Sequence, residues 1–117
     1  MKSRIILSLV FSLLLAGSLF AANNIFTGAV DNLWSNPNNW SEGRVPDASD
    51  TARIQNGVFC VVDYAAPPID HINIRTGGNV LQLVDGAHLV SNDWAVISLN
   101  GGTPENRDVM EILGGGV

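Results

Sequence analysis

The chain has 117 residues, which suits one domain, and its formal net charge is −5. An acidic chain of this size disfavours binding to nucleic acid or to anionic lipid, because like charges repel. The single cysteine, Cys60, excludes an intramolecular disulfide, so the core has to rest on apolar packing. Val58, Cys60 and Val62 alternate with their neighbours, and we therefore expect a buried, unreactive thiol.

Residues 1–22 have the pattern of a signal peptide. Lys2 and Arg4 precede an apolar stretch at 5–15, and small residues follow it at 16–18 and 21–22. This stretch is shorter than the about 20 residues that span a bilayer. We therefore expect export, cleavage, a secreted or cell-surface location and no stable membrane insertion afterwards. The part from Asn23 onward contains four arginines, no lysine and all 11 acidic residues.

Residues 23–117 are predicted to form one all-β module. They show no helical periodicity, and short apolar runs alternate with glycine, asparagine, aspartate and proline. Ile72 and Ile74, for example, flank Asn73, as expected for a strand with one buried face. The predicted strands are residues 24–27, 51–54, 58–62, 71–75, 80–84, 88–90, 95–99 and 109–113.

Turn residues separate these strands. They lie at residues 56–57, 77–79, 85–86, 100–102 and 114–116, and Asp85-Gly86 fits either a hairpin turn or the corner of a coil. Short strands at near-regular spacing, with glycine or asparagine at the corners, favour a β-solenoid, in which each coil stacks on the last. A β-sandwich uses the same ingredients and is the alternative. Because a solenoid needs a cap at each end, we expect residues 23–117 to be the N-terminal part of a longer β-helix.

The most specific segment is residues 33–54, where Asn36-Pro37 predicts a turn between Trp34 and Trp40. Two large aromatic side chains would clamp such a corner. The segment resembles the opening of many secreted bacterial parallel β-helix proteins of the autotransporter and surface type, and it is similar to the extracellular eight-glycine domain. The resemblance rests on Trp34, Trp40, Gly43, Val45-Pro46, Asp50, Ile54, Gly57 and Asp63. It implies the start of a right-handed parallel β-helix with an N-terminal cap. It also implies an extracellular location and a role in surface structure, adhesion or polysaccharide handling, with any catalytic residues in later coils.

The three tryptophans are the candidate carbohydrate-binding residues, because an aromatic face packs well against a pyranose ring. For Trp34 and Trp40 the alternative is that they plug the end of the core. Trp94 follows Asn92-Asp93 in a turn-like position, which favours its exposure.

Metal binding and catalysis have weaker support in the sequence. Calcium is a candidate ligand for Asp31, Asp47, Asp50 and Asp63, but their spacing matches no EF-hand and no calcium-binding repeat. We therefore favour turn capping and expect no cofactor. The two histidines have no cysteine partners for zinc, and no nucleophile or phosphate-binding motif is present. Residues 39–41 form an N-glycosylation sequon, which would be a surface site in a eukaryotic secretory protein.

Three functions are compatible with this pattern. The first is an exported, non-catalytic structural or adhesive β-helix module that contacts extracellular polysaccharide or the cell envelope. The second is the N-terminal module of a polysaccharide lyase or glycoside hydrolase whose active site lies beyond residue 117. The third is a small carbohydrate-binding β-sandwich.

Overall fold

The computed structural model describes residues 21–97 and 107–113. Its strands are β1 (Ala22–Ile25), β2 (Asp50–Ile54), β3 (Phe59–Val62), β4 (His71–Ile74), β5 (Val80–Leu83), β6 (Ala95–Ile97) and β7 (Val109–Ile112), and a 3-10 turn, η2, covers Pro37–Asn39. The all-β prediction is confirmed. Seven of the eight predicted strands are present with small shifts, whereas the predicted strand 88–90 is reduced to an isolated bridge at His88. The predicted signal sequence up to residue 20 and the predicted turns at 100–102 and 114–116 lie outside the described residues.

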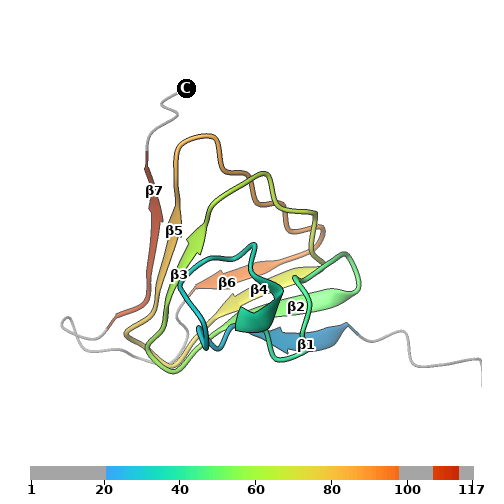
Figure 1. The fold of residues 1–117 in the computed structure, drawn as a ribbon, viewed down its shortest axis with the longest axis horizontal. Helices are drawn as coiled ribbons and strands as arrows, with labels where there is room; N and C mark the ends of the chain where they lie inside the picture. The colour runs from blue at the N-terminus through green and yellow to red at the C-terminus, as the bar shows by residue number, and fades with distance from the viewer. Residues whose placement is uncertain (1–20, 98–106, 114–117) are drawn as a thin grey trace, which may run out of the picture.

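The strands form two sheets, with strand orders β1-β2-β4-β6 and β3-β5-β7, and every neighbouring pair is parallel. From β2 onward the chain alternates between the two sheets, as Figure 1 shows. Parallel neighbours need such a crossover, because a tight turn joins only antiparallel strands. Asp85-Gly86 accordingly forms no hairpin. Ala87 N donates to Val84 O across this turn, and His88 then bridges Ala65 in parallel.

Equivalent residues of successive strands lie side by side, which sorts side chains into inward and outward columns. In the first sheet Ala52 pairs with Ile72 and Ile54 with Ile74, and all four are buried. In the second sheet the inward columns are Cys60 with Leu81 and Val62 with Leu83. The intervening residues point outward, since successive side chains of a strand face opposite sides of the sheet. The expected burial of Cys60 is thus confirmed.

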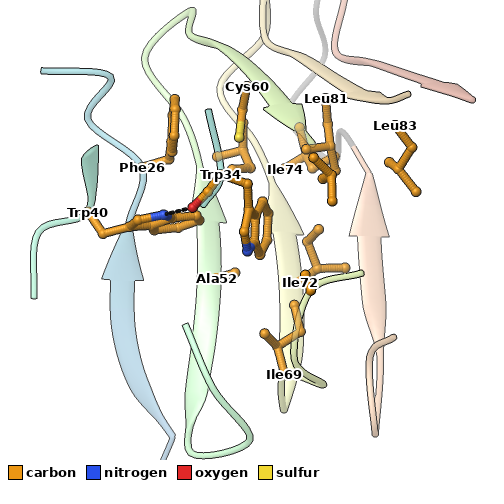
Figure 2. Close-up of a cluster of buried hydrophobic side chains, with 13 residues drawn as sticks. Phe26, Trp34, Trp40, Ala52, Cys60, Ile69, Ile72, Ile74, Leu81 and Leu83 are labelled. Atoms are coloured by element: carbon orange, nitrogen blue, oxygen red, sulfur yellow. Dashed lines mark hydrogen bonds between the residues drawn. The ribbon is translucent and has the colours of Figure 1, made fainter. Parts of the chain in front are cut away.

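One end of the core is covered by three aromatic side chains, Phe26, Trp34 and Trp40, which we call the aromatic plug (Figure 2). The Trp34 and Trp40 rings meet edge to face at 4.7 Å and 72°, and the Phe26 and Trp40 rings at 5.2 Å and 76°. Trp40 Nε1 donates to Trp34 O at 2.9 Å. This geometry suits the quadrupoles of the rings and holds the plug in one arrangement.

Asn39 anchors the chain around the plug. Its Oδ1 accepts from Val30 N and Asp31 N, and its Nδ2 donates to Asp31 Oδ1 and Leu33 O. The residue is fully buried. The folded chain therefore shields the amide that the glycosylation sequon would offer.

At the opposite end, three apolar side chains of the described strands are partly exposed. Ile97 continues the buried column of Ile54 and Ile74, yet it is 44% exposed. Met110 and Ile112 continue the buried columns of the second sheet and are 38% and 72% exposed. In the described part of the chain, β6 and β7 are the outermost strands at this end.

Candidate functional site

Trp94 lies on the outward face of the first sheet, directly before β6. Ile72 pairs with Ala95, so the residues before them, His71 and Trp94, are also neighbours. Their ring centroids are 4.3 Å apart with an interplanar angle of 41°, and Trp94 remains 41% exposed. The register of β4 and β6 thus rests Trp94 on His71 while leaving much of the indole open.

Backbone contacts fix the position of Trp94. Its carbonyl oxygen accepts from Ile72 N at 3.2 Å and from Ser91 Oγ at 2.9 Å. The same Ser91 hydroxyl lies 3.2 Å from Asp70 O, and Asp93 N donates to Asp70 O at 3.0 Å. The turn before β6 is therefore tied to β4, which fixes the position of the Trp94 backbone.

Two carboxylates flank the His71 ring. Its Nδ1 lies 2.9 Å from Asp70 Oδ2, and its Nε2 lies 3.0 Å from Asp93 Oδ2. The His71 side chain is 15% exposed, against 33% for Asp70 and 66% for Asp93. We call Trp94, His71, Asp70 and Asp93 the Trp94 platform. It combines an open aromatic face with hydrogen-bonding carboxylates, the two features by which proteins orient a sugar.

The other two candidate tryptophans are not part of this platform. Trp34 is fully buried and Trp40 is 3% exposed, and both belong to the aromatic plug. Their burial matches the alternative interpretation, in which these two residues plug the end of the core. Of the three candidates, only Trp94 presents its ring to solvent.

Sequence reasoning missed His71, Asp70 and Asp93 as members of the site. A signal was available, because Asp70-His71 and Asp93-Trp94 are both pairs in which an aspartate precedes a ring. Only the register of β4 and β6 makes the two pairs neighbours.

The four aspartates considered for calcium are all engaged by groups of the chain itself. Hydrogen bonds from Leu33 N and from the Asn39 and Asn36 side chains lower the pKa of Asp31. The Ser49 hydroxyl and N–H lower the pKa of Asp47. Asp50 forms an ion pair with Arg44, and Asp63 accepts from Ser35 N. Within residues 21–97 and 107–113, no three histidine, cysteine or acidic side chains converge to hold a metal ion.

The described residues also include the buried thiol of Cys60. Burial raises the pKa of the Cys60 thiol, with Asp63 adding to the effect, so the reactive thiolate is disfavoured. Among these residues, no helix has the length and apolar character needed to cross a bilayer.

The chain was compared with protein-family models, with curated proteins and with solved structures, and none of the three comparisons yields a match.

Proposed function

We propose that this chain is an exported, non-catalytic structural or adhesive module, built as the capped start of a right-handed parallel β-helix, which contacts extracellular polysaccharide through the Trp94 platform. The observation that carries the polysaccharide contact is the packing of the 41% exposed Trp94 on His71, on the outer face of a sheet. What distinguishes Trp94 from a singly exposed apolar residue is the set of polar groups around it: Ser91 Oγ binds its carbonyl oxygen, and two carboxylates contact the His71 ring on which it packs.

The sheet arrangement supports the β-helix part of the proposal. All five strand pairings are parallel, and the chain returns to each sheet after passing through the other. The strands of a β-sandwich would instead pair antiparallel. Parallel bridges between Ala65 and His88 and between Ile69 and Ser91 add a third line of stacking.

The two ends of the core differ, which indicates the direction in which further coils would stack. The aromatic plug covers the end near β1, whereas Ile97, Met110 and Ile112 are exposed beside β6 and β7. A further coil that stacked on these two strands would bury the three side chains and extend the columns below them. In this proposal the module supplies the cap and the first coils of a β-helix and carries no lyase or hydrolase chemistry of its own.

Binding to polysaccharides tests the proposal. The processed chain is incubated with insoluble polysaccharides and titrated calorimetrically with soluble oligosaccharides, and Trp94→Ala is compared with the unmodified chain. We expect Trp94→Ala to weaken binding about tenfold, because stacking on an aromatic face contributes about 1–3 kcal/mol in other ring systems.

Phe59→Ala is the matched control. Phe59 is 40% exposed on β3 in the other sheet, so its loss removes a similar exposed aromatic ring elsewhere. Equal binding by Trp94→Ala and the unmodified chain would remove the platform from the function. A crystal structure with antiparallel neighbours in either sheet would contradict the β-helix.

A further inference from the structure

The Trp94 platform contains two carboxylates and one imidazole. Asp93 and Asp70 stand beside the aromatic pair, and each contacts His71 through its Oδ2. One imidazole between two carboxylates leaves a net negative charge in either protonation state of the ring. In the described part of the chain, neither carboxylate forms an ion pair with an arginine; Arg44, for instance, is bound to Asp50 and Asp47.

We infer that the polysaccharide bound by the Trp94 platform carries protonated amino groups, as in a chain of glucosamine units. This inference rests on the proposed function and specifies its ligand. An ammonium group above an indole face is attracted by the quadrupole of the ring, and the attraction is larger for tryptophan than for other aromatic residues. A carboxylate next to that ring adds a charge-assisted hydrogen bond.

Asp93 is the residue placed to receive the amino group. It directly precedes Trp94, its side chain is 66% exposed, and its contact with His71 uses Oδ2 alone. Asp70 is half as exposed, at 33%, and lies on the other side of His71. Asp93 is thus the specificity-determining group, and Asp70 adds to the local field.

The opposite charge on a sugar would be unfavourable at the same place. A uronic acid stacked on Trp94 would bring its carboxylate close to Asp93, and like charges at such separations repel. The whole chain adds to this discrimination, because its formal net charge is −5. A neutral N-acetylated sugar keeps the stacking contact and loses the ionic one.

The test compares three hexasaccharides of glucosamine, N-acetylglucosamine and galacturonic acid by isothermal titration of the processed chain, in low salt at a pH that protonates the amine. We expect the glucosamine hexamer to bind about fivefold more tightly than the N-acetylated one, and the galacturonate hexamer to bind most weakly. Asp93→Asn should remove most of the fivefold difference.

Asp85→Asn is the matched control, because it makes the same charge change at an exposed turn between β5 and the next bridge. It should leave the preference for glucosamine unchanged. A salt titration tests the same inference on the unmodified chain. Added salt should weaken binding of the glucosamine hexamer and leave binding of the N-acetylated hexamer unchanged.

The outcomes separate this inference from the proposed function. Equal binding of the charged and N-acetylated hexamers, or a preference for galacturonate, overturns the ammonium specificity while Trp94-dependent binding upholds the polysaccharide function. If none of the three hexamers or the insoluble polysaccharides binds, both proposals fail. A glucosamine preference that survives Asp93→Asn and added salt also overturns the charge argument.

Discussion

Replacing each tryptophan of the aromatic plug by phenylalanine should have clearly unequal effects on stability. Both substitutions remove part of a buried indole, so the lost packing is similar. Trp40→Phe also removes the donor to Trp34 O and leaves that buried carbonyl oxygen without the 2.9 Å bond. Leaving a buried acceptor unpaired costs about 1–3 kcal/mol. Trp34 Nε1, in contrast, is buried without a hydrogen-bond partner in the described part of the chain, so Trp34→Phe removes an unsatisfied donor.

We therefore expect Trp40→Phe to lower the free energy of unfolding by about 2 kcal/mol more than Trp34→Phe, a factor of roughly 30 in the unfolding equilibrium constant. The measurement is urea denaturation followed by far-ultraviolet circular dichroism, which does not depend on tryptophan fluorescence. Equal denaturant slopes would show that both variants unfold from comparably compact states. Equal stabilities, or a less stable Trp34→Phe, would refute this account of the plug.

Three further predictions concern buried and capping groups. Cys60 should resist a thiol reagent in native buffer and react fully in denaturant, because burial raises the pKa of its thiol; fast labelling of the native chain would contradict its burial. In the folded chain the pKa values of Asp31 and Asp47 are lowered from 3.8. The stability that these two carboxylates add to the folded state is therefore fully present above pH 3.8, and it is lost as the pH falls through their folded-state pKa values. Urea midpoints measured from about pH 5 to pH 2 should fall more for the unmodified chain than for the double variant Asp31→Asn, Asp47→Asn. Arg44→Ala should destabilise by about 1–3 kcal/mol, because it leaves the fully buried Asp50 carboxylate without its cation; an unchanged urea midpoint would show that other donors suffice.

Local sequence patterns predicted most of the strands in this chain. Alternation along a strand depends only on neighbouring residues, so Ile72 and Ile74 around Asn73 locate β4 without knowledge of its partners. The segment 88–90 is the exception. It contributes one isolated bridge, at His88, and the next bridge falls just after it, at Ser91. A short apolar run has no fixed strand character of its own, since pairing depends on its neighbours.

The role of each tryptophan was only partly predictable. The turn at Asn36-Pro37 between Trp34 and Trp40 indicated that the two rings would be close, and they do meet at 4.7 Å. Whether a close aromatic pair lies in the core or on the surface depends on what covers it. Here Phe26, from a separate part of the chain, contacts Trp40 and completes the plug.

The sequence by itself determined the all-β class, the strand positions, the buried thiol and the exposure of Trp94, because these follow from residue type and short-range alternation. Only the tertiary structure decided that Trp94 rests on His71, that two carboxylates flank the His71 ring, and that Asn39 of the sequon is buried. All three depend on residues brought together by strand register and loop packing. A shift of one residue would turn every side chain of a strand to the other face, so no local pattern specifies these contacts.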